Sequence, residues 1–267
     1  MKTISKTILL ILILGCSTPK QKDTNLEQID FSWNFNEPTK HNYKISIRAT
    51  GKNDFRGDGP ENVQLFGNGK LIINVKGNEL ADMSLIDLKM SNVSYEGEIP
   101  VDTFTNTSSP VIVQDIKAGD RFSNTPSAIP FDLVFPTISS TLELGNSMKI
   151  DSKIPFTANG SRLWSKGLNE IKFEEIITFQ GEECALLNGK FEIAKVDIPD
   201  EIEGDYVVST NGTASYVFSL NRRFYVKSEL EFFTKFDFSK NEDSEYDESM
   251  KMESNNKLLI EINQDGE

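Results

Sequence analysis

Residue types that could carry out nucleophilic or acid–base catalysis are scarce in this chain. Its 267 residues include a single histidine, His41, and two cysteines, Cys16 and Cys184. A cysteine nucleophile or a Ser-His-Asp triad needs a histidine base, and His41 is the only histidine available. Glu182 and Glu183 lie beside Cys184 and would raise its thiol pKa, which opposes thiolate chemistry. We therefore expect Cys184 to be a buried structural cysteine and His41, which precedes a strand, to be an exposed loop residue.

Paired carboxylates are the second kind of chemistry to consider. Glu174-Glu175 and Glu182-Glu183 are adjacent in strand-like runs. Neighbouring side chains of a strand point to opposite faces, so neither pair can form a two-carboxylate site. Glu229 and Glu231 share a face, but two lysines share it with them, which is typical of a solvated surface. A carboxylate-based hydrolase assembled from distant strands is therefore only the third functional hypothesis.

The loop from residue 53 to residue 59, Asn-Asp-Phe-Arg-Gly-Asp-Gly, has the composition of a calcium loop without its spacing. Counting from Asp54, position three is Arg56 and position twelve is Leu65, where an EF-hand has oxygen ligands. We interpret the loop as a turn and predict no metal site and no cofactor. The 28 basic residues against 41 acidic ones give a net charge of −13, which opposes nucleic-acid binding. We expect no catalytic residues, so the prediction is that this protein is not an enzyme.

The first residues have the three parts of an export signal. Lys2 and Lys6 give a positive start, residues 8–14 form an unbroken apolar run, and Gly15 and Cys16 follow. The apolar run is far shorter than the ~20 residues of a membrane-spanning helix. A small residue directly before a cysteine at this position resembles the lipobox of bacterial lipoproteins. The resemblance implies cleavage of residues 1–15 and acylation of Cys16 with chains such as palmitate, which would anchor the mature protein in a membrane.

The same resemblance implies a location in the cell envelope. Ser17, rather than an aspartate, follows Cys16, which in lipoproteins of this kind implies the outer membrane of a Gram-negative cell. Whether the protein faces the periplasm or the outside is left open. Residues 16–28 are polar and have no apolar period, and we interpret them as a flexible tether between the membrane and the domain.

Beyond the tether, apolar residues recur with a period of two, which is typical of half-buried antiparallel strands. The clearest case runs from Arg223 to Phe238, where even positions are mostly apolar and odd positions mostly charged. We expect one long strand with its even positions buried and its odd positions solvated. Phe233 is an apolar residue on the polar face, and we expect it to cover an edge, contact a partner or meet a second layer.

Turn signals divide the strand-like runs. Four segments containing glycine and asparagine predict hairpin turns: Gly67-Asn68-Gly69, Lys76-Gly77-Asn78, Asn188-Gly189 and Asn211-Gly212. In the run from residue 81 to residue 90 the apolar residues change from odd to even positions, which predicts a β-bulge near Leu85. The charged residues 240–248 predict the exposed tip of a long hairpin.

These patterns predict an almost all-β, mainly antiparallel fold of about a dozen strands. We expect a long-stranded curved sheet, a half-barrel or a sandwich, with at most one or two short helices. Residues 163–171 are the candidate for a helix. The β-rich domain is expected to cover residues 29–267, and the stretch 117–136, which contains prolines and glycine, is the candidate for a subdivision within it.

A second resemblance concerns Phe135-Pro136 followed by residues 142–148, Leu-Glu-Leu-Gly-Asn-Ser-Met. It is similar to a segment of some poorly characterised β-rich lipoproteins of Gram-negative envelopes, although Asn146 and Met148 stand where those proteins have an acid and a tryptophan. The segment holds no catalytic residue. The leading hypothesis is a lipid-anchored, non-catalytic binding or assembly module whose partners are the membrane and an envelope protein or ligand. The alternative is a carrier of an apolar ligand in a half-open β-barrel.

Overall fold

The computed structural model of this chain describes residues 28–55, 59–96, 99–118, 129–138, 141–158, 161–196, 205–239 and 249–262. The predicted signal peptide, Cys16, the tether before Gln28 and the charged tip at residues 240–248 lie outside the described residues. The elements are β1 (Gln28–Asp30), β2 (Thr39–Phe55), β3 (Glu61–Gly77), β4 (Leu80–Glu96), β5 (Ile99–Thr107), β6 (Val111–Lys117), α1 (Phe131–Val134), β7 (Thr141–Glu143), β8 (Ser147–Ala158), β9 (Ser161–Phe179), β10 (Glu182–Val196), β11 (Asp205–Ser219), β12 (Phe224–Ser239) and β13 (Ser249–Ile262).

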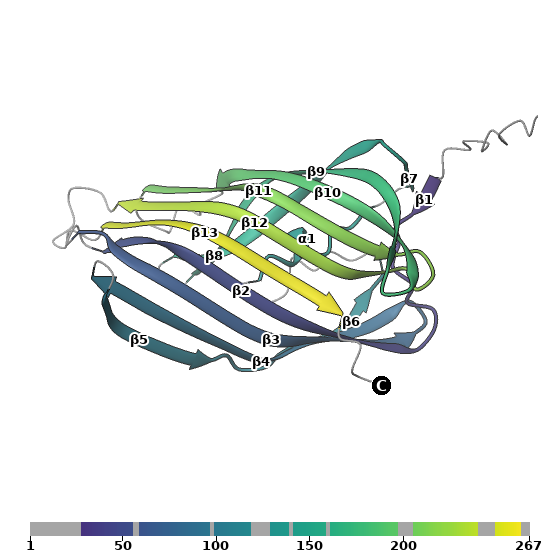
Figure 1. Cartoon of the computed structure of the whole chain (residues 1–267), viewed down its shortest axis with the longest axis horizontal. Helices are drawn as coiled ribbons and strands as arrows, with labels where there is room; N and C mark the ends of the chain where they lie inside the picture. Colours follow the sequence, from purple (N-terminus) through teal and green to yellow (C-terminus); the bar gives the residue numbers. More distant parts are fainter. Residues whose placement is uncertain are drawn as a thin grey trace, which may run out of the picture.

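Eleven of these strands form one large antiparallel sheet. Its order is β5-β4-β3-β2-β13-β12-β11-β10-β9-β8, and β6 also pairs with β4. Figure 1 shows that the sheet curves around its own interior, so that β8 and α1 lie behind β12 and β13. The last strand, β13, lies between β2 and β12 and so joins the two halves of the chain. The predicted all-β fold with a long-stranded curved sheet is confirmed.

The two faces of the sheet differ as the alternation predicts. We call the enclosed face the inner face and the solvated one the outer face. In β12 the buried even positions are Phe224, Val226, Ser228, Leu230, Phe236 and Phe238. Glu231 and Lys235 on the opposite face are exposed. The long strand expected from the sequence is therefore confirmed, and it pairs along its length with β11 and β13.

Tyr225 is the exception in this strand, because it is an odd position and is fully buried. The ladder between β11 and β12 shifts register between Val217 and Phe218. Such a bulge turns the following side chain to the other face. The Tyr225 hydroxyl accordingly points inward and donates a hydrogen bond to the Pro136 carbonyl at 2.8 Å.

Two segments outside the large sheet fill its inner face at one end, and we call them the plug. The plug consists of residues 31–36 and 129–138. Its buried residues include Phe31, Trp33, Phe35, Phe131, Leu133 and Phe135. The Ser228 hydroxyl donates a hydrogen bond to the Val134 carbonyl at 2.6 Å, which satisfies a backbone group that is shielded from water. Residues 129–136, part of the stretch predicted as a subdivision, are therefore integral to the core.

The candidate helix at residues 163–171 does not form, because these residues lie in the middle of β9. Leu163 and Ile171 are buried, and three small or polar residues alternate between them on the inner face: Ser165, Gly167 and Asn169. Because these inward positions are not apolar, the period of two is not visible when only apolar residues are considered. The one helix in the described part is the single turn α1, which is buried in the plug. No helix among the described residues has the length and apolar character needed to cross a membrane.

Of the four segments predicted to form hairpin turns, only the one at Gly77 and Asn78 connects two strands. Gly77 and Asn78 connect β3 to β4 with φ values of 85° and 54°. The predictions for Gly67-Asn68-Gly69, Asn188-Gly189 and Asn211-Gly212 are wrong, because these segments lie inside β3, β10 and β11. Glycine in a strand interior marks a bend or a close approach of two backbones.

The β-bulge predicted near Leu85 is confirmed, slightly further along β4. The register between β3 and β4 shifts opposite Asn68 and Lys70, and Asp87 has a φ of 54°. Leu85 and Leu88 are consequently both buried although one is odd and the other even. The change of face inferred from the sequence therefore has the expected cause.

Candidate functional site

Cys184 has the environment expected of a structural cysteine. It lies in β10, is a free thiol and has no exposed surface. Burial raises the pKa of the Cys184 thiol, and the negative charge of Glu182 acts in the same direction. The predicted burial is confirmed, and a protonated, enclosed thiol is poorly suited to nucleophilic attack.

The prediction that His41 is an exposed loop residue is wrong. His41 lies in β2, is 4% exposed, and its ring centre is 3.8 Å from that of Phe224. Trp33 and Phe35 of the plug also contact Phe224, so this end of the sheet is sealed by aromatic rings. Burial lowers the pKa of His41 to about 4, and the positive charge of Arg222 adds to the effect. The imidazole is therefore neutral at pH 7 and packs in the core.

We expect His41 to reduce stability in mild acid. Between pH 6.5 and pH 4 the unfolded chain takes up a proton at this residue that the folded protein excludes. The loss in unfolding free energy between pH 7 and pH 4.5 should be about 2–3 kcal/mol. Urea melts at the two pH values measure it, and His41→Leu should remove most of this loss. An equal loss in the parent and the variant would contradict the assignment.

The candidate acids do not converge. Glu182 accepts hydrogen bonds from Ser219 and Arg222, whereas its neighbour Glu183 is exposed on the other face. Asp54, near the end of β2, accepts a hydrogen bond from the Gly59 N–H at 3.2 Å, and residues 56–58 of the predicted turn lie outside the described residues. Within the described ranges, Asp132 is the one buried carboxylate and no cluster of three potential metal ligands occurs.

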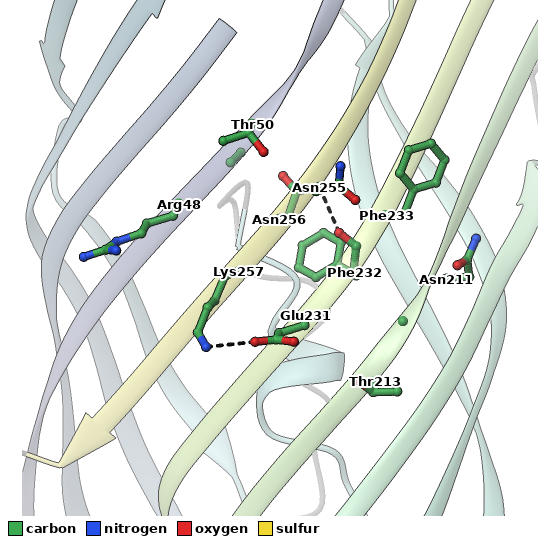
Figure 2. Close-up of a pocket in the computed structure, with 12 residues that line it drawn as sticks. Arg48, Thr50, Asn211, Thr213, Glu231, Phe232, Phe233, Asn255, Asn256 and Lys257 are labelled. Atoms are coloured by element: carbon green, nitrogen blue, oxygen red, sulfur yellow. Dashed lines mark hydrogen bonds and ion pairs between the residues drawn. The ribbon is translucent and has the colours of Figure 1, made fainter.

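The outer face of the large sheet carries a shallow depression that we call the outer groove. It consists of three adjoining hollows of about 750, 540 and 610 Å³. Thr213 and Glu231 line both the first and the second hollow, and Thr50, Phe233 and Asn255 line both the second and the third. The outer groove therefore runs across the strands, from β8 to the end of β4. Figure 2 shows its middle part, where Phe233 lies beside Asn211 and Asn255.

A line of uncharged side chains crosses the outer groove, and we call it the central row. Its members are opposed in register on five neighbouring strands: Asn211, Phe233, Asn255, Thr50 and Gln64. Phe233 is partly buried between the two asparagines, while Asn211, Asn255 and Thr50 are exposed. The Gln64 side chain accepts a hydrogen bond from the Tyr95 hydroxyl at 3.4 Å. Amides, a hydroxyl and a phenyl ring are thus presented together to solvent.

Charged residues flank the central row on both sides. The flanking positions in register are Glu231, Lys257 and Arg48 on one side and Lys235, Glu253 and Lys52 on the other. Lys257 pairs with Glu231 at 2.8 Å, and Lys235 pairs with Glu253 at 3.6 Å. Arg48 and Lys52 have no ion-pair partner within the described part of the chain. The flanks therefore carry two unpaired positive charges in a chain whose net charge is −13.

The ion pairs of the first flank extend to Glu229, which lines the first hollow of the outer groove, and to Lys227. Lys257 also contacts Glu229 at 2.5 Å, and Lys227 contacts Glu229 at 3.4 Å. The hydrogen bonds to Glu229 and Glu231 raise the pKa of Lys257, and the hydrogen bond from Lys257 lowers the pKa of Glu229. The pairs therefore stay charged at neutral pH. The expectation that Glu229 and Glu231 lie on a solvated face with lysines is confirmed.

Glycines form the floor of the outer groove. Gly189, Gly212 and Gly51 each line one of the three hollows. A Cβ atom on Gly51 would lie 2.1 Å from the Glu253 carbonyl oxygen, so β2 and β13 are too close for a side chain at this point. The missing Cβ atoms let the strands bend and approach one another, which is the usual role of glycine in strongly curved sheets.

Sequence reasoning named several residues of this site but did not bring them together as a site. Phe233 was conspicuous as an apolar residue on a polar face, but it covers no edge, because β12 lies between β11 and β13. Two glycines of the floor, Gly189 and Gly212, were noticed and interpreted as turns. The site residues lie on strands that are distant in sequence, so only the register of the whole sheet brings them together.

No protein-family model matches this chain, and no curated protein matches it.

Proposed function

We propose that this protein is a lipid-anchored, non-catalytic binding protein of the cell envelope, and that the outer groove is its binding surface. The observation that carries the binding function is the central row, because it groups a partly buried phenyl ring with exposed amides in the middle of a charged face. Aromatic residues that are partly accessible and combined with polar groups are typical of recognition surfaces. The anchor is supported by the resemblance of Gly15-Cys16 to a lipobox.

The proposed anchor sets how far the domain can extend from the membrane. Residues 17–27 separate Cys16 from β1. A polar tether of this length has a typical span of about 20 Å and a maximum of about 40 Å. β1 lies at the plugged end of the sheet (Figure 1), beside β7. The plugged end would therefore lie nearest the membrane, and the outer groove would face sideways and remain accessible.

A carrier of an apolar ligand is the second candidate, favoured by one feature of the inner face. At the end away from the plug, Val208, Phe236 and Phe238 form an apolar cluster separate from the main core. Met250 and Met252 pack against this cluster and are only partly buried. Flexible, partly exposed methionines suit adaptable apolar contacts. Mass spectrometry of an organic extract of the purified protein tests this alternative, which requires a bound lipid.

The proposed lipid anchor is tested by replacing Cys16, the residue that would carry the acyl chains. Cys16→Ser should abolish incorporation of radiolabelled palmitate and move the protein from the detergent phase to the aqueous phase in detergent partitioning. The physical reason is that acyl chains contribute ~0.8 kcal/mol per buried methylene, and the variant has none. Cys184→Ser is the matched control, because it changes the other cysteine and should leave labelling intact. Membrane association of the Cys16→Ser protein would overturn the proposed anchor.

A further inference from the structure

We propose that the central row of the outer groove binds an acidic saccharide, that is, an oligosaccharide that carries carboxylate groups. This inference names the ligand class for the binding function proposed above and rests on it. It follows from the backbone pairing beneath the groove, the side chains of the central row and the unpaired cations beside it.

The position of the outer groove restricts recognition to side chains. An extended peptide usually binds a sheet by adding a strand to a free edge through backbone hydrogen bonds. The strands under the central row, β11, β12, β13, β2 and β3, are each paired on both sides. Their backbone groups are therefore already used in the ladders, and a ligand in the groove must be held by what projects from the face.

The side chains of the central row match the two kinds of surface of a sugar ring. Asparagine and glutamine side chains both donate and accept hydrogen bonds, as sugar hydroxyls do. Phe233 offers an apolar ring on which the C–H face of a sugar can pack. Asn211 and Asn255 flank this ring in register on the neighbouring strands. Five residues on strands about 4.8 Å apart span about 19 Å, the length of a short oligosaccharide rather than of a single sugar.

The charges select an acidic sugar over a neutral one. Arg48, Thr50 and Lys52 are successive outward residues of β2, so the two cations stand on either side of the central row. Each is about 7 Å from Thr50 along the strand, within reach of a carboxylate placed over Thr50. Arg48 can bind a carboxylate with two parallel hydrogen bonds. The other four flanking charges already form ion pairs, so Arg48 and Lys52 are the groups available for the ligand.

Isothermal titration of the full-length lipidated protein in detergent micelles tests the inference. The probes are hexagalacturonic acid, neutral maltohexaose and hexaglutamate. Maltohexaose tests whether a sugar without charge is enough for binding, and hexaglutamate tests whether negative charge without a sugar is enough. Hexagalacturonic acid should bind at least about tenfold more tightly than either of the others. Phe233→Ser and Arg48→Gln should each weaken its binding about tenfold.

Matched controls come from exposed residues outside the outer groove. Phe104→Ser changes an exposed phenylalanine of the edge strand β5, and Lys89→Gln removes an exposed cation of β4. Both should bind hexagalacturonic acid as the parent does. Binding of hexaglutamate or maltohexaose as tight as that of hexagalacturonic acid would overturn the ligand class, and so would no binding of the acid. Sugar binding that Phe233→Ser leaves unchanged would overturn the groove itself as the binding surface.

Discussion

Leu133→Asp is expected to prevent folding. Leu133 lies in α1 within the plug and has no exposed surface. Leu133 belongs to the main hydrophobic core, and the Tyr225 and Ser228 hydroxyls of β12 already donate their hydrogen bonds to the Pro136 and Val134 carbonyls of the plug. A carboxylate there would lose its hydration without gaining a partner. The loss should exceed about 4 kcal/mol, a large part of the stability of an ordinary domain. Circular dichroism and urea melts of the purified variant measure it.

Leu144→Asp is the matched control, because it makes the same chemical change at an exposed residue. Leu144 follows β7 and is 38% exposed. Its replacement should change the unfolding free energy by about 0.5–1 kcal/mol. If Leu133→Asp melted like Leu144→Asp, the plug would be detachable and the curved sheet would be stable without a filled inner face.

The plug also shows where sequence reasoning ends. Several strands were predictable because they alternate apolar and polar residues locally, as in Arg223 to Phe238. Residues 129–138 contain Pro130 and Pro136, a pattern typical of a connection between domains. Nothing local indicates that this segment covers the inner face, since a strand pattern identifies a buried side but not what buries it. The same reason explains His41, which packs against Phe224 of β12, a residue far along the chain.

The outer groove was less predictable than the fold. Its central row needs the pairing of β13 with β2, which joins Asn255 to Thr50 across most of the chain. The register between distant strands is a property of the folded sheet and has no local sequence pattern. An apolar residue on a polar face, such as Phe233, is visible in the sequence. The Asn-Gly segments did mark positions where a side chain has little space, but glycine serves both a turn and a close approach of two strands. Which of these two roles a glycine has depends on where its strand ends, and the sequence does not define the strand ends.

Gly212→Val should cause the second large loss, because the backbone of β11 approaches β12 at this residue. Gly212 does not have a positive φ, so the constraint is space and not conformation. A Cβ atom at Gly212 would lie 2.3 Å from the Glu231 carbonyl oxygen and 2.5 Å from the Phe232 Cβ. Both atoms belong to or adjoin the β12 backbone, which is paired with β13 and cannot move alone. We expect a loss of about 3–5 kcal/mol in unfolding free energy, above the usual range for overpacking.

Thr213→Val places the same side chain one residue further along β11, where it points outward into the outer groove. Its effect on stability should stay within about 0.5 kcal/mol, since a branched residue suits an exposed strand position. Urea melts of the two variants therefore distinguish the effect of limited space on the inner face from the effect of β propensity on stability. Equal melts would mean that β11 and β12 do not approach closely at Gly212. The bent glycine floor would then be absent, and with it the hollow in which Phe233 and its neighbouring amides lie together.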